Sequence, residues 1–272
     1  MFRSNSTRNP SFSKRVDKSS KKQRSSFQTP SKSRRLEHAA SAMESVVHTS
    51  PAQQTSPSLT SPIVTICVGR EQRLFAAHED VLSHSHYLSA LCRAQFYESP
   101  KRIDLPEEEP EIFSCVLEYL YKGDYYPRLE YDKRRQSWQL EDGTSPDRQS
   151  SVESTVFLNG HGVQVLKDTA VYCLAEKFGL AELQRLALRK QGLQSGIQCS
   201  TILTSARYAY ANTPEHDSKL RAHYLALIIR SRHTFKRSGT MQQEMEQGGK
   251  LFFDLFVAMT NHMDDLVKSP RH

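Results

Sequence analysis

Residues 63–77, with the sequence IVTICVGREQRLFAA, contain the pattern that decides the fold. A run of β-branched and apolar residues stops at Gly69, a polar turn follows, and a second strand-like run extends from Arg73 to Ala77. Because side chains alternate along a strand, Val64, Ile66 and Val68 share one face. Two such runs joined by a short turn predict a β-hairpin with one buried face.

Downstream of the hairpin, the apolar residues recur at helical spacing. Residues 78–92 fit one or two short helices, and residues 102–105 form a short strand that ends at Pro106. Pro110 can open the next helix, because its missing N–H is not needed in the first turn. That helix ends at Gly123, and its apolar stripe consists of Ile112, Phe113, Val116, Leu117 and Leu120.

Residues 127–160 interrupt this pattern with a charged and polar sequence. Turn-forming pairs occur at residues 142–143 (Asp-Gly) and 145–146 (Ser-Pro). We therefore expect an inserted, mostly disordered loop. Its ends can pair weakly, through Tyr131 and Trp138 or through residues 156–158.

Helical periodicity returns at Val165 and predicts two helices separated by Gly179, the second ending near Gly192. Three further helical segments follow at residues 200–210, 217–232 and 249–266. The last has a wide apolar face that the domain or a partner must cover: Leu251, Phe252, Leu255, Phe256 and Met259. The predicted fold class is α+β, a small sheet flanked by helices with a C-terminal helical extension (residues 193–272).

Residues 1–62 differ in composition from the rest of the chain. They contain eleven Lys and Arg but three Asp and Glu, a net charge of +8, whereas the whole chain has +7, so residues 63–272 are nearly neutral. Such a polar segment cannot bury enough apolar surface to offset the entropy of ordering, which predicts a disordered basic tail and linker. One stretch within it has helical spacing: Leu36, Ala39, Ala40, Met43, Val46 and Val47.

The chemistry-bearing residues do not form a recognisable catalytic or metal-binding motif. Five cysteines stand apart in apolar stretches, which is typical of reduced, buried thiols in an intracellular protein: Cys67, Cys92, Cys115, Cys173 and Cys199. His78, His84, His86 and Cys92 are close in sequence but lack the paired spacing of a zinc finger. We therefore expect neither a metal nor a cofactor.

Motifs for catalysis and for membrane insertion are also absent from the sequence. It contains no G-x-S-x-G elbow, no phosphate-binding G-x-x-x-x-G-K-[ST] loop and no G-x-G-x-x-G element. It contains no apolar run long enough to span a membrane, and no signal-peptide pattern follows the first basic residues. An enzyme is the least favoured interpretation.

The order of these elements, together with the residues at their joints, resembles the BTB/POZ domain family, and most closely the short BTB-domain proteins of fungi. The resemblance rests on six stretches: residues 63–69, FAAHEDVL at 75–82, FYES at 96–99, IDLP at 103–106, VLEYLYKGDY at 116–125 and VYCLAEKF at 171–178. The resemblance implies a BTB/POZ-like domain over residues 63–192, with the insertion at about 127–160. It implies protein binding rather than catalysis, and a homodimer as one form of assembly.

The resemblance also implies a partner. BTB proteins that bind cullin scaffolds have a hydrophobic-x-Glu motif in the loop before the short strand, and Phe96, Tyr97 and Glu98 occupy that place. An apolar anchor beside a carboxylate suits a compact binding hot spot. The resemblance thus suggests a substrate adaptor for a cullin-type ubiquitin ligase. In the alternative interpretation, Phe96 packs into the domain's own core and Glu98 is solvated.

The basic tail has three interpretations. Lys14, Arg15, Lys21, Lys22 and Arg24 resemble a nuclear import signal. The same charges could bind nucleic-acid phosphates without sequence specificity, or they could only keep the tail soluble. The alternative function is therefore a nuclear scaffold or chromatin-associated factor, and the expected location is the nucleus, the cytoplasm or both.

Overall fold

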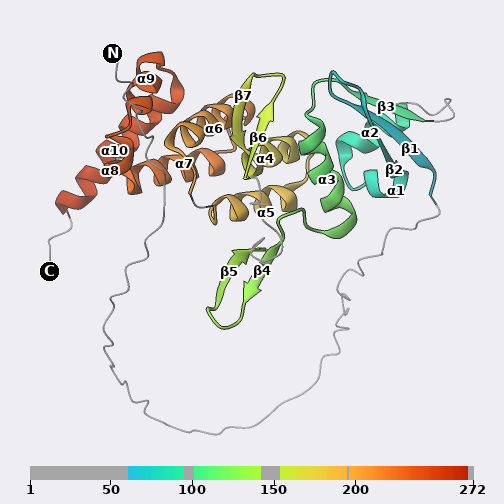
Figure 1. Cartoon of the computed structure of the whole chain (residues 1–272), viewed down its shortest axis with the longest axis horizontal. Coiled ribbons are helices and arrows are strands. Elements are labelled where there is room, and N and C mark those ends of the chain that lie inside the picture. Colours follow the sequence, from blue (N-terminus) through green and yellow to red (C-terminus); the bar gives the residue numbers. More distant parts are fainter. Residues whose placement is uncertain (1–60, 95–100, 142–153, 195, 269–272) are drawn as a thin grey trace, which may run out of the picture. The chain divides into compact units, whose positions relative to one another are not determined.

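The fold is α+β, as the sequence predicts, and it begins with a three-stranded sheet (Figure 1). This computed structural model describes residues 61–94, 101–141, 154–194 and 196–268, so the predicted basic tail lies outside the described residues. The hairpin is formed by β1 (Ile63–Val68) and β2 (Arg73–His78), and β3 (Arg102–Leu105) joins β1 in parallel, in the order β2-β1-β3. The predicted inner face is confirmed, since Val64, Ile66 and Val68 are fully buried.

The helices next to the sheet also follow the sequence. They are α1 (Glu79–Leu82), α2 (His86–Ala94) and α3 (Pro110–Lys122). Helix α3 begins at Pro110 and ends at Gly123, whose φ of 73° is left-handed, as expected for a glycine cap. Gly69 is required for two reasons. Its φ of 77° lies in the left-handed region that favours glycine, and a Cβ at this position would lie 3.0 Å from the Pro110 ring.

The prediction of a mostly disordered insertion is wrong for the described part of it, whereas the predicted pairing through Tyr131 and Trp138 is confirmed. Residues 129–140 form a hairpin of β4 (Leu129–Asp132) and β5 (Ser137–Leu140), and β6 (Thr155–Leu158) pairs with β7 (Val163–Leu166). Residues 142–153 lie outside the described residues.

Packing against the rest of the fold explains both hairpins. Tyr131 lies opposite Trp138 with ring centroids 5.2 Å apart, and the Arg189 guanidinium lies 5.3 Å from the Trp138 ring. In the second hairpin, Val156 and Val165 pair across the strands and are buried. Val165 therefore belongs to a strand, and the predicted helix begins two residues later than expected.

The remaining helices confirm the predicted C-terminal segments and add two. Helices α4 (Lys167–Lys177) and α5 (Ala181–Gln191) are followed by α6 (Cys199–Asn212), α7 (Lys219–Arg230) and α10 (Lys250–Lys268). The two short helices α8 (Arg232–Phe235) and α9 (Gly239–Gln247) were not predicted, because their sequences have no clear apolar stripe. One continuous core runs from the sheet to α10, with Val64 and Leu255 among its members.

Lys190 on α5 is fully buried and sits at the centre of a polar network. Its ammonium group donates hydrogen bonds to the Asp124 carboxylate and to the carbonyl oxygens of Tyr125 and Pro127, the last at 2.7 Å. The nitrogen also lies 3.7 Å from the centroid of the Tyr125 ring. Burial lowers the pKa of Lys190, and these partners offset part of the cost of burying its charge.

The same network continues into α4. The Tyr125 hydroxyl donates to Asp168 Oδ1 at 2.7 Å, and Gln194 Nε2 donates to Asp168 Oδ2 at 2.7 Å. Asp168 is buried, and burial raises the pKa of its carboxyl group. The chain that leaves α3 is thereby held against both α4 and α5.

Further buried hydrogen bonds connect α4 and its preceding strand to the C-terminal helices. The Thr169 and Tyr224 hydroxyl groups are hydrogen-bonded, and Thr169 also donates to Gln191 Oε1 at 2.9 Å. The Leu166 N–H donates to the Ser205 hydroxyl at 2.8 Å. Helices α6 and α7 are thus integral to the fold.

Replacing Lys190 tests how much the network stabilises the protein. In Lys190→Met the charge is lost while an apolar side chain remains, and Asp124 and two carbonyl groups lose their buried donor. We expect the free energy of unfolding to fall by about 3–5 kcal/mol, measured by chemical denaturation. Lys177→Met is the control, because it removes an ion pair with Glu108 in which Lys177 is half exposed; its expected loss is below about 1 kcal/mol. Equal losses for the two variants would contradict the role of the network.

Candidate protein-interaction site

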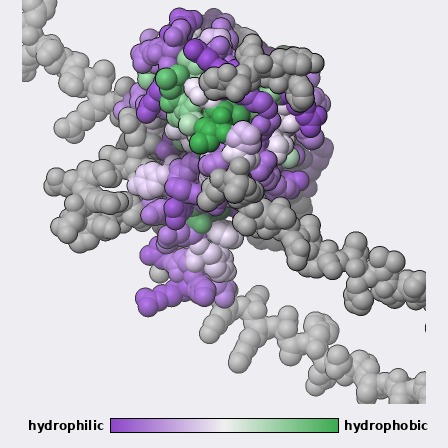
Figure 2. Space-filling view, turned by 90° about the vertical axis from the view of Figure 1, so that its right-hand side faces the viewer, coloured by the Kyte–Doolittle hydropathy of each residue, from purple (hydrophilic) through white to green (hydrophobic). Residues whose placement is uncertain are grey.

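The outward face of the three-stranded sheet carries exposed apolar side chains. Ile63 and Leu74 are 61% and 65% exposed, and the strand register puts Leu74 beside Cys67 and Ile63 beside His78 on this face. Figure 2 views the molecule from the end where the sheet lies and shows a hydrophobic patch surrounded by hydrophilic side chains. Such a patch at the surface is typical of a protein contact.

The loop between α2 and β3 leaves from the same end of the molecule. Its residues 95–100, including Phe96, Tyr97 and Glu98, lie outside the described residues. Just after the loop, Lys101 Nζ pairs with the Glu79 carboxylate at 2.7 and 2.8 Å, and the Lys101 carbonyl accepts the Thr65 N–H at 3.0 Å.

The Lys101–Glu79 ion pair, called here the Lys101–Glu79 anchor, is partly shielded from solvent, since the two side chains are only 22% and 29% exposed. Cys92 on α2 is buried nearby, and burial together with the Glu79 charge raises the pKa of its thiol. The loop therefore starts from a helix in the core and ends on a strand that is fixed to both β1 and α1.

Two histidines of this sequence cluster, His78 and His84, have structural partners. The ring Nδ1 of His78 and its backbone N–H are both hydrogen-bonded to the Tyr121 hydroxyl, at 2.8 and 3.0 Å. These bonds join β2 to α3. His84 Nδ1 bonds to the Val81 carbonyl oxygen at 3.1 Å. Among the described residues, no three His, Cys, Asp or Glu side chains gather closely enough to hold a metal ion.

The cysteines of the described ranges are free thiols. Cys67, Cys92, Cys173 and Cys199 are buried, as predicted, whereas Cys115 is half-buried. Burial raises the pKa of Cys173 and Cys115, which favours the unreactive thiol form.

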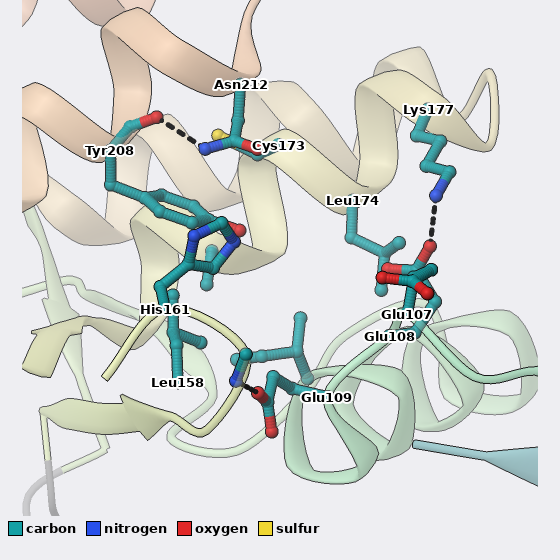
Figure 3. A pocket seen from close by; sticks show the side chains of 13 residues that line it. Glu107, Glu108, Glu109, Leu158, His161, Cys173, Leu174, Lys177, Tyr208 and Asn212 are labelled. Atoms are coloured by element: carbon teal, nitrogen blue, oxygen red, sulfur yellow. Dashed lines mark hydrogen bonds and ion pairs between the residues drawn. The ribbon is translucent and has the colours of Figure 1, made fainter. Parts of the chain in front are cut away.

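A pocket of about 230 Å³ lies between the loop before α3, the β6–β7 turn and helices α4 and α6 (Figure 3). Glu108 pairs with Lys177, and Glu109 accepts hydrogen bonds from the Gly160 N–H at 2.9 Å and from Asn159 Nδ2 at 3.3 Å. In Figure 3 the His161 ring lies beside the ring of Tyr208, with centroids 5.4 Å apart.

The polar groups of this pocket thus mainly hold the β6–β7 turn against the start of α3. The sequence pattern did not reveal this arrangement, because Glu109 and Gly160 are far apart in the chain. None of the described helices has both the length and the hydropathy needed to cross a membrane.

Residues 63–134 match the family model of the BTB/POZ domain, and the match extends from β1 into the turn between β4 and β5. The chain contains a BTB/POZ domain. No curated protein matches the chain significantly. BTB/POZ domains are protein–protein interaction modules and are generally non-enzymatic, which agrees with the lack of catalytic motifs. The predicted end of the domain at residue 192 stays a prediction.

The structure connects the matched residues 63–134 to one another and to α4 through groups that are far apart in the sequence. His78 is hydrogen-bonded to Tyr121, and the buried Ser85 hydroxyl donates to the Phe178 carbonyl at 2.7 Å, so that α1 is held on both sides. Lys14, Arg15, Lys21, Lys22 and Arg24 lie outside the described residues, and their role as an import signal stays a prediction.

The Lys101–Glu79 anchor can be tested by removing its charge. In Lys101→Met the Glu79 carboxylate loses its partner in a partly buried place, and we expect the free energy of unfolding to fall by about 1–2 kcal/mol. Lys122→Met is the control, since its pair with Glu118 is a more exposed i,i+4 pair that contributes about 0.3–0.5 kcal/mol. Urea titration of the two variants compares them, and a smaller loss for Lys101→Met than for Lys122→Met would refute the anchor.

Proposed function

We propose that this protein is a substrate adaptor for a cullin-type ubiquitin ligase, with Phe96 and Glu98 as its cullin contact. The observation that supports this proposal is the hydrophobic-x-Glu sequence in the α2–β3 loop of a BTB/POZ domain. The described ends of that loop are attached to the core at Cys92 and at the Lys101–Glu79 pair.

Fixed loop ends favour binding for a physical reason. Ordering a loop on binding costs conformational entropy, and a short loop between two fixed ends has less of it to lose. An aromatic side chain beside a carboxylate then provides one apolar anchor and one charged acceptor in a small area. Tyr97 lies between them in the sequence and adds a second aromatic group.

An adaptor also needs a second surface for its substrate. The chain offers the β4–β5 hairpin with its exposed Tyr131 and Trp138, and the exposed apolar side chains of α10. Both lie on elements other than the α2–β3 loop, so a substrate held there would leave the proposed cullin contact free.

The test is capture of the full-length protein from its own cells, followed by mass spectrometry. Wild type should recover a cullin, and the double variant Phe96→Ala/Glu98→Ala should recover about tenfold less or none, because a hot-spot pair is lost. The matched control is Phe157→Ala/Glu111→Ala, which truncates an exposed Phe and an exposed Glu on β6 and α3.

The control should recover as much cullin as wild type. Circular dichroism verifies that each variant is folded. Absence of cullin from the wild-type sample, or equal recovery with all three proteins, would reject the adaptor function.

The charge of residues 1–62 favours a second candidate function, that of a nuclear scaffold whose tail contacts nucleic acid. Eleven cations in one segment neutralise phosphates without reading sequence, so the affinity for DNA should fall steeply as salt is raised. We expect deletion of residues 1–62 to remove both the affinity and its salt dependence in a fluorescence-anisotropy titration. Salt-independent binding, or binding that survives the deletion, would exclude this role for the tail.

A further inference from the structure

A pocket opens at the N-terminal end of α9. It has a volume of about 630 Å³ and is called here the α9 pocket. Residues 236–239, in the turn after α8, line its first part, and the side of α9 that carries Met241, Met245 and Glu246 lines the rest. The α9 pocket shares no lining residue with the pocket of Figure 3.

Ser238 lines the α9 pocket and is the N-cap residue of α9. Serine at this position usually accepts a hydrogen bond from the first turn of its helix. Here the residue is only 7% exposed, yet its hydroxyl group makes no capping bond and has no other hydrogen-bond partner among the described residues. Of the described side-chain atoms, only Gln191 Nε2 is both unpaired and closed to solvent. The unpaired Ser238 hydroxyl is therefore accessible from the pocket.

The backbone supplies two further donors at the same place. The first N–H groups of a helix have no acceptor within it, and those of Gly239 and Thr240 have no acceptor elsewhere in the described ranges. The next one, the Met241 N–H, already donates to the Ser238 carbonyl oxygen at 3.1 Å. Because Gly239 is exposed and has no side chain, its N–H is open to a ligand. Such donors at the positive end of a helix dipole suit an anion.

The charged side chains of the α9 pocket also favour an anion at this end. Lys236 and Arg237 are exposed, and neither pairs with a carboxylate of the described residues. Glu246 is the acidic residue of the lining, and its carboxylate accepts a hydrogen bond from Gln242 Nε2 at 3.0 Å. It follows Ser238 by eight residues, which is about 12 Å along a helix. The end of the pocket at Ser238 is therefore positive.

We propose that the α9 pocket binds a phosphorylated serine or threonine within an extended segment of a partner protein. The phosphate oxygens accept hydrogen bonds from the Ser238 hydroxyl and from the N–H groups of Gly239 and Thr240. Lys236 and Arg237 neutralise the charge of the phosphate, which is close to −2 at neutral pH. This inference rests on the proposed adaptor function and names the class of substrate that the adaptor recruits.

The length of the pocket favours a peptide over a free phosphate ion. The lining continues from the anion-binding end to Met245, which is 55% exposed and lies six residues after Gly239, roughly 9 Å along the helix. An extended peptide advances about 3.3 Å per residue, so its side chain two or three residues from the phosphate reaches Met245. Methionine adapts to apolar groups of different shape. The expected segment therefore has an apolar residue at that distance.

Two other sources of phosphate fit the lining less well. None of the residues that line the α9 pocket is aromatic, so the base of a nucleotide has no ring to stack on. A membrane would bring its anionic headgroups close to the exposed Glu246, which repels them.

Fluorescence anisotropy of the purified full-length protein tests the proposal. The probe is a fluorescein-labelled peptide of glycine and alanine that contains one phosphothreonine and, three residues later, one leucine. Wild type should bind it roughly tenfold or more tightly than the same peptide without the phosphate, because charge-assisted hydrogen bonds are lost. Replacing the leucine by glycine should weaken binding about threefold or more. No cullin is present, so failure of the cullin contact does not affect this measurement.

A pair of variants at Gly239 tests the backbone donor. Gly239→Pro removes the N–H, and the fold accepts it, because proline suits the first position of a helix and Ser238 before it is extended, with φ of −86° and ψ of 120°. A Cβ at this position meets nothing within 4 Å. Gly239→Pro should weaken binding of the phosphorylated probe roughly tenfold. The matched control Gly239→Ala keeps the N–H and should bind like wild type.

A second pair tests the charge. Arg237→Met should weaken binding of the phosphorylated probe roughly tenfold, because a charge-assisted bond is lost. The control Arg93→Met removes an equal charge from an exposed side chain on α2 that does not line the α9 pocket, and it should have no effect. Circular dichroism verifies that all four variants are folded.

Several results would overturn the proposal. These are equal affinity for the phosphorylated and unphosphorylated peptides, equal weakening by Gly239→Pro and Gly239→Ala, or equal weakening by Arg237→Met and Arg93→Met. Inorganic phosphate that binds as tightly as the probe would assign the site to a free anion. Binding to vesicles that contain phosphatidylinositol phosphate, lost in Arg237→Met and accompanied by no peptide binding, would assign it to lipid.

Discussion

The buried ammonium group of Lys190 is the interaction on which the arrangement of this protein depends. It lies on α5, yet its acceptors are Asp124, Tyr125 and Pro127, which follow α3. Because each of these groups is costly to leave unpaired away from water, the chain leaving α3 cannot move away from α5 without a large loss of free energy. Tyr125 extends the constraint to α4 through its bond with Asp168. The BTB/POZ domain and the helices after it are consequently one cooperative structure.

This continuity matters for function, because one core joins the elements that carry two different exposed surfaces. The sheet end carries exposed Ile63 and Leu74 and the fixed ends of the α2–β3 loop, while α10 carries exposed apolar side chains such as Phe253 and Phe256. A partner at the sheet end does not compete for area with a partner on α10.

Local pattern predicted most of the fold, and the corrections have physical reasons. The β1–β2 hairpin, β3, α3 and the helical pair α4–α5 were predictable, because their apolar residues repeat with the period of their own structure. The pairing of Tyr131 with Trp138 was also predictable, but two complete hairpins within the insertion were not, because strands of four residues are too short to show a clear period. What stabilises the first of them is the contact of Trp138 with Tyr131 and with Arg189, which lies on a distant helix. Of the candidate site, the sequence revealed the Phe96-x-Glu98 motif but not the Lys101–Glu79 anchor.

The sequence by itself determined the class of the domain, the inner face of its sheet and the apolar character of the last helix, since all three follow from side-chain type and spacing along the chain. Only the tertiary structure decided which side of α10 is covered, which carboxylate pairs with Lys190, and that Glu109 before α3 holds the β6–β7 turn. Those outcomes depend on groups separated by many residues. Their distances are set by how the elements pack, and no local pattern encodes them.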